Sequence, residues 1–164
     1  LKKPNADPDD PNNYRPISNV PILAKLMEKC VLSQLSCHIA QFNLLDKCQF
    51  GFRPGHSTET ALVHIVDDTL QILDQNEACL LILLDLYSAF DTVNHDNLLN
   101  RLEKRMGLSG TVLNRFSSYL HNRFQRIKVN QNLSGPSAVK TGVPQSSTLS
   151  PTLFNLPVNI YQYS

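Results

Sequence analysis

One apolar run limits what this chain can fold into. Residues Ala78–Leu84 are all apolar, and the run ends at Asp85, which is followed by Leu86. A continuous apolar run of strand length is typical of a strand that is covered on both faces. We therefore expect residues 78–86 to form a fully buried central strand with a carboxylate near its end.

The apolar spacing elsewhere predicts helices. Four stretches show the period near 3.6 residues that is typical of a helix with one apolar face: 21–39, 58–75, 94–106 and 110–121. In the first, the expected buried residues are Ile22, Leu26, Cys30, Leu35 and Ile39. Residues 46–56 are expected to form a loop.

Strands are predicted towards the C-terminal end. Polar and apolar residues alternate over 123–130, which predicts a strand, and residues 136–143 provide a partner. The Asn130–Gly135 turn between them favours an antiparallel hairpin. The mixture of helices and strands predicts an α+β fold.

The charges are distributed unevenly. The 15 basic and 14 acidic residues give a net charge of +1, yet residues 104–164 contain no Asp or Glu at all. Within this acid-free segment, Arg123, Arg126 and Lys128 lie along the predicted strand 123–130. Two interpretations are equally open: these residues follow a nucleic-acid phosphate backbone, or they are the solvated charges of an edge strand.

Several classes of protein are not favoured. No apolar run reaches the roughly 18–20 residues that a membrane-spanning helix needs, and the N-terminus has no signal-peptide pattern. We expect an intracellular protein, in the nucleus or the cytoplasm, without a membrane partner. The cysteines lack zinc-like or disulfide-rich spacing and are expected to be reduced, mostly buried thiols: Cys30, Cys37, Cys48 and Cys79.

Asp85 is a candidate metal ligand. A carboxylate at the end of a buried strand is costly unless it is paired or coordinates a cation, and Mg²⁺ prefers oxygen ligands. An Asp at a strand end is also often a cap or a salt-bridge partner, so the residue alone leaves these alternatives open. By the same reasoning Asp91 is expected to cap the next helix.

The residues around Asp85 read LLDLYSAFDTVNH, over 83–95, and this stretch resembles the first catalytic box of reverse transcriptases from non-LTR (LINE-type) retrotransposons. Three other stretches resemble blocks of the same family in the same order. They are NYRPIS at 13–18 followed by KLMEK at 25–29, QFGFRPGHST at 49–58, and GVPQSSTLSPTLF at 142–154. The resemblance covers about residues 1–155.

The resemblance implies a fold and an activity. It implies the fingers-and-palm part of a right-hand polymerase, with about 1–77 fingers-like and helical and about 78–164 an incomplete palm. The implied activity is that of an RNA-directed DNA polymerase. The implied partners are an RNA template, a DNA primer and deoxynucleotides.

The resemblance also implies roles for single residues. Asp85 matches the first catalytic carboxylate, which holds Mg²⁺ together with a backbone carbonyl at the position of Leu86. Phe90 stands at the steric-gate position that disfavours ribonucleotides, and Gln145 stands beside the nucleotide. Arg53 matches a fingers arginine near the nucleotide phosphates or the template. The alternatives are a core aromatic for Phe90 and ordinary loop residues for Gln145 and Arg53.

One family box has no match in this sequence. The second catalytic carboxylates are expected on a Tyr-x-Asp-Asp hairpin, but the Asp-Asp pairs here are Asp9-Asp10 and Asp67-Asp68, which precede the first box. We therefore expect a fragment that is truncated before that hairpin and the thumb, and that is inactive alone. Its uncovered palm surface is expected to favour self-association. The stretch 142–154 resembles the family's palm box, and the stretches 13–18 and 25–29 resemble its N-terminal fingers block. Within the palm box, Ser146 stands where the family has Gly.

Two other interpretations remain. The chain is a non-catalytic remnant that binds RNA or an RNA–DNA hybrid through its acid-free segment, or a pseudogene product without a selected role.

Overall fold

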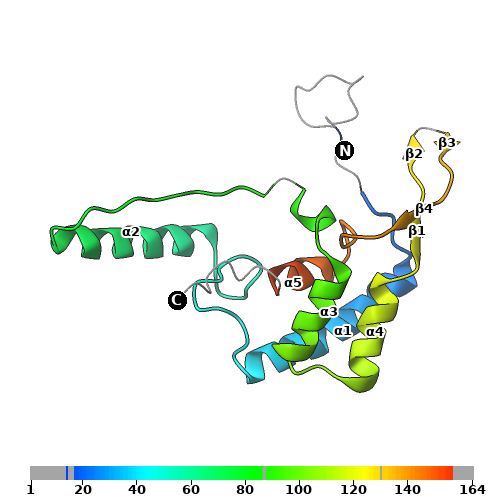
Figure 1. Ribbon diagram of the computed structural model, residues 1–164, viewed down its shortest axis with the longest axis horizontal. Coiled ribbons are helices and arrows are strands. Elements are labelled where there is room, and N and C mark those ends of the chain that lie inside the picture. The colour runs from blue at the N-terminus through cyan, green and yellow to red at the C-terminus, as the bar shows by residue number, and fades with distance from the viewer. Residues whose placement is uncertain (1–13, 15–16, 87, 130, 157–164) are drawn as a thin grey trace.

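The computed structural model has a helical body and two projections (Figure 1). It describes residues 14, 17–86, 88–129 and 131–156. Some of the residues discussed above lie outside this description. They are residues 13, 15 and 16 of the stretch NYRPIS, and the pair Asp9-Asp10. One projection, the arm, is residues 58–86. The other, the hairpin, is residues 123–139, and the two lie at opposite ends of the molecule.

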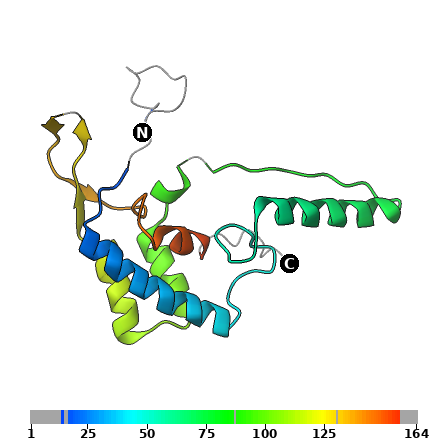
Figure 2. The same ribbon diagram turned by 180° about the vertical axis from the view of Figure 1, so that it is seen from behind.

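Four helices form the body: α1 (Ile22–Gln41), α3 (His95–Lys104), α4 (Gly110–Leu120) and α5 (Ser150–Asn155). In the view from behind, α1 lies across α3 and α4 (Figure 2). The core includes Leu35 and Ile39 of α1, Phe116 of α4, and the residues Leu98, Leu102 and Leu153, which have no exposed surface. Burying leucines from three helices in this way is the main stabilising contribution to the body.

The four predicted helices are confirmed, and residues that favour helix ends lie at several of their termini. Ser57 caps α2 (Thr58–Asp74) and forms a capping box with Thr60. Asn94 caps α3 by accepting a hydrogen bond of 2.9 Å from the backbone N–H of Asn97. After α3, Gly107 adopts a φ of +67°, the left-handed geometry that ends many helices.

The predicted buried face of α1 is confirmed in part: Leu35 and Ile39 are buried as expected, and the other three expected residues are exposed. Ile22 and Leu26 are 85% and 59% exposed, and Cys30 is exposed as well. The face that meets the body carries Glu28, Leu35 and Ile39, together with partly buried Val31 and Leu32. The expectation is wrong for the first half of the helix, because its apolar residues there form a second stripe that stays exposed.

The central strand predicted at 78–86 is wrong. The segment is extended but belongs to no sheet in the described structure, and its side chains are exposed, with Leu80 at 83% and Leu83 at 80%. A strand needs neighbours that accept and donate its backbone hydrogen bonds. The described residues supply no such neighbour to this segment, which runs alongside α2 as the second half of the arm (Figure 1).

The predicted antiparallel hairpin is confirmed, but it consists of two short strand pairs in place of one continuous pair. Strand β1 (Arg123–Gln125) pairs with β4 (Ser137–Val139), and β2 (Lys128–Val129) pairs with β3 (Asn132–Leu133). The predicted single strand 123–130 is therefore interrupted at 126–127, where Ile127 instead exchanges hydrogen bonds with Ser134. Its last residue, 130, lies outside the described residues.

The four cysteines are free, but the prediction that they are mostly buried is wrong because all four are exposed. Two lie on the outer side of α1, and the others lie in the loop before α2 and in the arm: Cys30, Cys37, Cys48 and Cys79. Among the described residues, no helix is both long and apolar enough to cross a membrane.

Candidate functional site

Two segments that are far apart in the sequence meet beside the body. The first is the single turn η2 (Ala89–Asp91) with the residues that follow it, and the second is residues 141–145. The backbone N–H of Val143 donates to the carbonyl of Phe90, and that of Gly142 donates to the carbonyl of Val93, each at 2.8 Å. These bonds fix the stretch 83–95, which resembles the first catalytic box, against the stretch 142–154, which resembles the palm box.

Gly142 makes this contact possible. Its φ is +88°, and a Cβ at this position would lie 2.9 Å from the Cα of Asp91 and 3.1 Å from the carbonyl oxygen of Phe90. Any side chain would therefore force the two segments apart. The buried ring of His95 adds a further bond, because its Nε2 lies 2.8 Å from the Gly142 carbonyl oxygen.

Gln145 contacts the first box directly. Its side-chain amide donates to both carboxylate oxygens of Asp91, at 3.1 and 3.0 Å, and its backbone carbonyl accepts from the N–H of Ser18 at 3.1 Å. Asp91 therefore does not cap α3, as the sequence had suggested, since Asn94 occupies that position. The carboxylate of Asp91 instead orients the Gln145 side chain.

Phe90 lies in η2 with a partly buried ring. Its centroid is 5.0 Å from that of Phe154 in α5, and the two rings are tilted by 43°. This contact matches the core-aromatic interpretation of Phe90. It also holds the ring in a defined place next to the segment that carries Gln145.

Asp85 and Leu86 lie at the end of the arm, just before the chain turns into η2. Both are exposed, and Ser88 makes the turn with a φ of +53°. No group of three or more His, Cys, Asp or Glu side chains within the described ranges is arranged to hold a metal ion. At this position Asp85 offers its carboxylate, and the backbone carbonyls beside it offer further oxygen atoms.

Arg53 is part of the loop before α2 and lies apart from Phe90 and Gln145. Its guanidinium donates to the carbonyls of Asp46, at 3.0 Å, and Gln49, at 3.5 Å. It lines a cavity of about 380 Å³ between the end of α1, this loop and α5. Asn155 of α5 ties the same loop to the body with a 2.8 Å bond to the carbonyl of Gly51.

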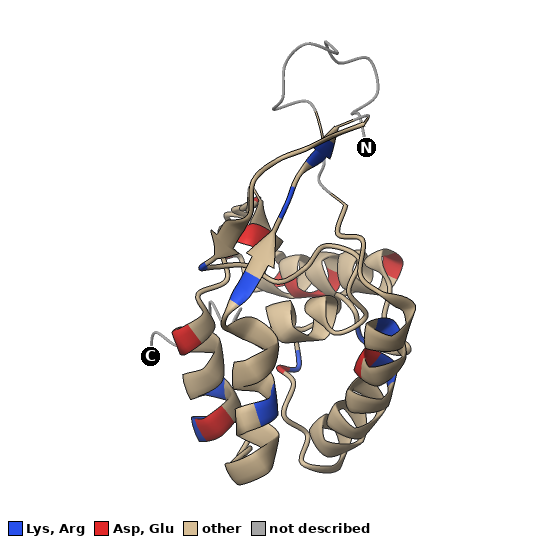
Figure 3. Cartoon of the chain, turned by 90° about the vertical axis from the view of Figure 1, so that its right-hand side faces the viewer, with Lys and Arg blue, Asp and Glu red and all other residues tan. Residues whose placement is uncertain are grey.

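The three predicted nucleic-acid contacts lie on the hairpin, and all are exposed. Arg123 is anchored, because its guanidinium donates to the Tyr119 carbonyl at 3.2 Å and stacks 5.6 Å from the Tyr119 ring centroid. Arg126 and Lys128 follow along the ribbon, and Figure 3 shows their strip of basic residues running up the hairpin.

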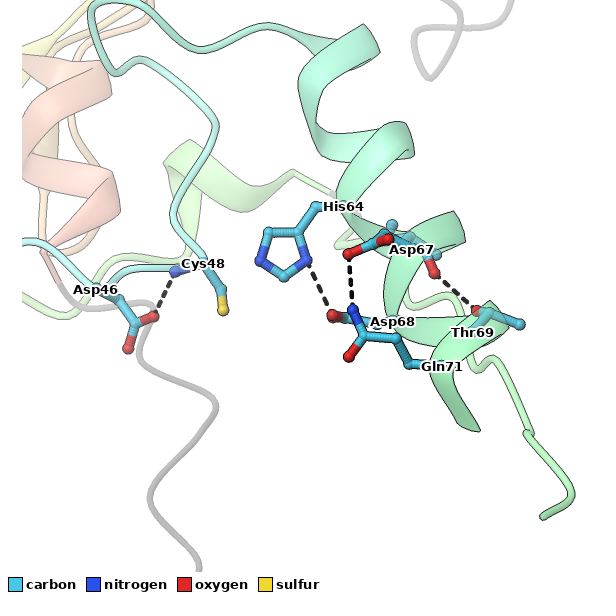
Figure 4. Close-up of polar contacts among 8 residues, drawn as sticks. Asp46, Cys48, His64, Asp67, Asp68, Thr69 and Gln71 are labelled. Atoms are coloured by element: carbon cyan, nitrogen blue, oxygen red, sulfur yellow. Dashed lines mark hydrogen bonds and ion pairs between the residues drawn. The ribbon is translucent and has the colours of Figure 1, made fainter. Parts of the chain in front are cut away.

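The pair Asp67-Asp68 belongs to the middle of α2 and not to a hairpin turn. Asp67 accepts a hydrogen bond of 2.8 Å from Gln71, and Asp68 lies 3.0 Å from His64 (Figure 4). Each carboxylate thus contacts a residue four positions away along the same helix. This arrangement agrees with the expectation that the pair is not the second catalytic box.

Glu28, to which the sequence analysis assigned no role, joins the stretch 25–29 to the stretch 142–154. Glu28 of α1 is 5% exposed and accepts hydrogen bonds from the hydroxyl of Ser147 at 2.8 Å, the N–H of Thr148 at 2.9 Å and the hydroxyl of Tyr119 at 3.3 Å. Three donors compensate for the burial of its carboxylate. One sequence feature could have indicated that Glu28 is buried. It lies on the same helical face as Val31, Leu32 and Leu35.

The pKa of Tyr119, which takes part in this network, lies above its ordinary value. Burial raises the pKa of its hydroxyl, and the charge of Glu28 raises it further, while the 2.8 Å contact with Ser147 acts in the opposite direction. The phenol therefore stays neutral and remains available as a donor to Glu28.

Ser146 follows Gln145 with a φ of +85°. This is the left-handed region, which glycine adopts at lower cost than residues with a Cβ. The exposed Ser146 side chain is thus tolerated there, and the backbone geometry is the one for which the family pattern uses Gly.

Comparisons with known proteins identify the family that this sequence matches. Residues 1–161 match the family model described as reverse transcriptase (RNA-dependent DNA polymerase). The chain is 33% identical, over 95% of its length, to the probable RNA-directed DNA polymerase from transposon BS of Drosophila melanogaster, and 32% identical over the same share to that of the mobile element jockey of Drosophila funebris. It is 26% identical, over 91% of its length, to the retrovirus-related Pol polyprotein from the type-1 retrotransposable element R2 of Popillia japonica.

The chain spans 17% of the length of the first two relatives and 20% of the third.

Proposed function

Because the chain belongs to the reverse transcriptase family, we propose that it supplies the fingers and part of the palm of an RNA-directed DNA polymerase of a LINE-type retrotransposon. In this proposal, residues 1–77 are the fingers-like part and residues 78–164 are part of the palm. The observation that carries it is the contact between boxes at Phe90, Gly142 and Gln145. A nucleotide site needs the residues of both boxes on one surface, and the 2.8 Å backbone bonds around Gly142 keep them there.

The roles proposed for single residues follow from this arrangement. Gln145, oriented by Asp91, presents its amide beside the incoming deoxynucleotide, and the ring of Phe90, supported by Phe154, restricts the space for a ribose 2′-hydroxyl. Arg53 contacts nucleotide phosphate or template from the fingers side. Its bonds to the carbonyls of Asp46 and Gln49 fix its position in the loop.

The ligands for Mg²⁺ are of the right kind but too few. Asp85 and the carbonyl of Leu86 offer the oxygen atoms that Mg²⁺ prefers. A two-metal mechanism needs more negative charge than one carboxylate provides, because two divalent ions lie about 3.5–4 Å apart. The residues present do not fit a complete metal pair, so we propose that this chain alone does not polymerise.

Primer extension on an RNA template with a DNA primer tests the proposed lack of polymerase activity. With Mg²⁺ or Mn²⁺ we expect no incorporation above the level of an Asp85→Asn variant. Incorporation that is lost in Asp85→Asn would show that the chain has a working catalytic centre and would overturn the predicted inactivity, while supporting the polymerase assignment.

The hairpin favours a second candidate function, the binding of RNA or an RNA–DNA hybrid without catalysis. Arg126 and Lys128 are exposed on a ribbon whose own sequence, 123–139, contains no Asp or Glu, which favours a positive potential along it. Phosphate contacts of this kind weaken as salt rises, because bound counterions are released.

Fluorescence anisotropy with a labelled hybrid separates the two functions. Salt-dependent binding that survives Asp85→Asn and is lost in the double variant Arg126→Ala/Lys128→Ala supports the binding function. An Arg115→Ala variant, on the body, serves as the matched control. Equal binding by the hairpin variant and the control would exclude the hairpin as the binding surface.

A further inference from the structure

The segment that carries Gln145 is a tight turn closed by a backbone hydrogen bond. The N–H of Ser147 donates to the carbonyl oxygen of Pro144 at 3.0 Å, so Gln145 and Ser146 are the two central residues of the turn. The hydroxyl of Ser150, at the start of α5, donates to the same carbonyl at 2.8 Å. The conformation of this turn decides where the side chain of Gln145 points.

Ser146 makes the turn costly to keep. It stands at the second central position with a φ of +85°, and a turn with a positive φ at that position usually has Gly there. A residue with a Cβ is strained in this region, and such strain persists only where the surrounding structure holds it. The turn therefore needs contacts from outside its own four residues.

Glu28 of α1 provides such contacts at the end of the turn. Its Oε2 accepts hydrogen bonds from the hydroxyl of Ser147 at 2.8 Å and from the N–H of Thr148 at 2.9 Å. Its Oε1 accepts from the hydroxyl of Tyr119, which also lies 2.8 Å from the Ser147 hydroxyl. Glu28 is 5% exposed, so these charge-assisted bonds are shielded from water and are strong.

We propose that Glu28 is a positioning residue for the nucleotide site. Its carboxylate holds residues 146–148 and thereby keeps the strained turn in the form that places the Gln145 amide on Asp91. The inference rests on the proposed function, in which Gln145 meets the incoming deoxynucleotide. The start of the turn is fixed independently, by the backbone bonds around Gly142 and by the bond from Ser18 to the Gln145 carbonyl. Without Glu28, the end of the turn is the side that relaxes.

A purely structural role for Glu28 makes a different prediction. In that case its removal lowers the free energy of unfolding but leaves the folded turn unchanged. In a positioning role, its removal also changes the folded state, because Ser146 relaxes to a negative φ and Gln145 turns away from Asp91. Ser146→Gly should then cancel the effect, since glycine keeps a positive φ without strain.

Nuclear magnetic resonance of the ¹⁵N-labelled chain, without nucleotide, separates the two roles. The measured quantities are the side-chain amide signals of Gln145 and the hydrogen exchange of the Thr148 N–H. The variants are Glu28→Ala, Glu28→Gln and the double variant Glu28→Ala/Ser146→Gly. The control Glu103→Ala removes an exposed carboxylate from α3, and Leu102→Ala destabilises the core from the same helix.

Glu28→Ala should move the Gln145 amide signals to the positions of an amide in water. It should also speed exchange of the Thr148 N–H roughly tenfold, because that group loses a charged acceptor. The double variant should restore the Gln145 signals but not the protection of Thr148. Both controls should keep the wild-type Gln145 signals, although Leu102→Ala unfolds more easily.

Glu28→Gln should behave as the wild type does. Its amide oxygen can accept from Ser147 and Thr148, while its NH₂ group donates to the hydroxyl oxygen of Tyr119. If Glu28→Ala does not fold, Ser147→Ala carries the test, because it removes the hydroxyl bond to the carboxylate and leaves the acceptor of Thr148 in place. It should move the Gln145 signals less far, and Ser146→Gly should cancel that movement too.

Two results would overturn the positioning role. One is a Glu28→Ala variant that unfolds more easily but keeps the Gln145 signals of the wild type. The other is a double variant whose Gln145 signals stay where those of Glu28→Ala lie, which would show that strain at Ser146 is not what Glu28 holds.

A titration with dTTP and Mg²⁺ then links the turn to the nucleotide. The chain is bound to an RNA template and a DNA primer with a dideoxy end, so that no extension occurs. The Gln145 signals of the wild type should respond to dTTP, and Glu28→Ala should need roughly tenfold more dTTP, a factor that one lost hydrogen bond can supply. No response in the wild type would overturn the proposed function. A response of equal strength in both would overturn the role of Glu28 alone.

Discussion

The body and the arm contain similar sequence patterns but differ completely in burial. Helix α3 is rich in polar residues, yet Leu98 and Leu102 are fully buried because α1, α4 and α5 surround them. Helix α2 carries more apolar residues than α3, and none of them is buried. An amphipathic pattern therefore shows which face can be covered, and the neighbouring elements decide whether it is.

The largest expected difference between the two regions is in the cost of removing a leucine. Leu98→Ala should lower the free energy of unfolding by roughly 2–5 kcal/mol, because it leaves a cavity in the core. Leu70→Ala on the arm, measured in dilute protein, should change it by less than about 0.5 kcal/mol. Urea denaturation of both variants makes the measurement. Equal losses would mean that α2 is packed as α3 is.

A second contrast uses two glycines with positive φ. Gly142→Ala should cost roughly 2–4 kcal/mol, because backbone strain is joined by a clash with Asp91 at 2.9 Å. Gly55, at the base of the arm, has a φ of +75°, and no atom lies within 4 Å of the place that a Cβ would take, so Gly55→Ala carries the strain alone. Thermal unfolding should separate the two variants. A Gly142→Ala variant no less stable than Gly55→Ala would contradict the close approach.

Two glutamates give a smaller contrast. Glu28→Ala should destabilise the chain by roughly 1–3 kcal/mol, because the N–H of Thr148 and the hydroxyl of Ser147 lose their acceptor. Glu77→Ala on the arm removes an exposed carboxylate and should have little effect. Chemical denaturation at neutral pH compares them, with Glu28→Gln as the variant that keeps an acceptor oxygen. If Glu28→Ala matches Glu77→Ala, the network does not stabilise the body.

The smallest contrast concerns pH. The raised pKa of Tyr119 means that its contribution to stability is complete below its ordinary pKa of about 10 and is lost as the pH rises through the higher folded-state value. On the arm, the hydrogen bond from Ser57 lowers the pKa of Glu59, so the contribution of Glu59 is lost only as the pH falls through that lowered value.

Unfolding measured from pH 8 to pH 11 on the wild type and on Tyr119→Phe checks the alkaline part. The variant should lose less stability over this range. An identical loss in both would show that Tyr119 does not ionise with a raised pKa.

Sequence patterns predicted the elements of this fold better than their contacts. Capping residues and glycines act locally, and Ser57 and Gly107 lie at helix ends, where such residues are favoured. The apolar run 78–86 indicated a buried strand, but burial depends on partner strands that a local pattern does not contain. The same limit applies to α1, where spacing alone did not distinguish the face with Leu26 from the face with Leu35.

For the candidate site, motif spacing located the segments, and three-dimensional contacts refined the roles. The resemblance pointed to Phe90 and Gln145, and these now lie on segments joined by hydrogen bonds. It gave no reason to connect Gln145 with Asp91 or Glu28 with Ser147, because each pair depends on how distant segments pack. The catalytic role of Asp85 stays a prediction.

The bond between Glu28 and Thr148 has a consequence for how the molecule folds. Its two residues are 120 positions apart, so the contact closes a loop that contains most of the chain. Contacts of such high sequence separation carry a large entropic cost and slow folding. Helix α1 leaves the ribosome long before the loop that Glu28 holds, and the carboxylate of Glu28 lacks the donors from Ser147 and Thr148 until synthesis has passed residue 148. The folded structure of the loop that carries Gln145 is therefore among the last parts of the body to form.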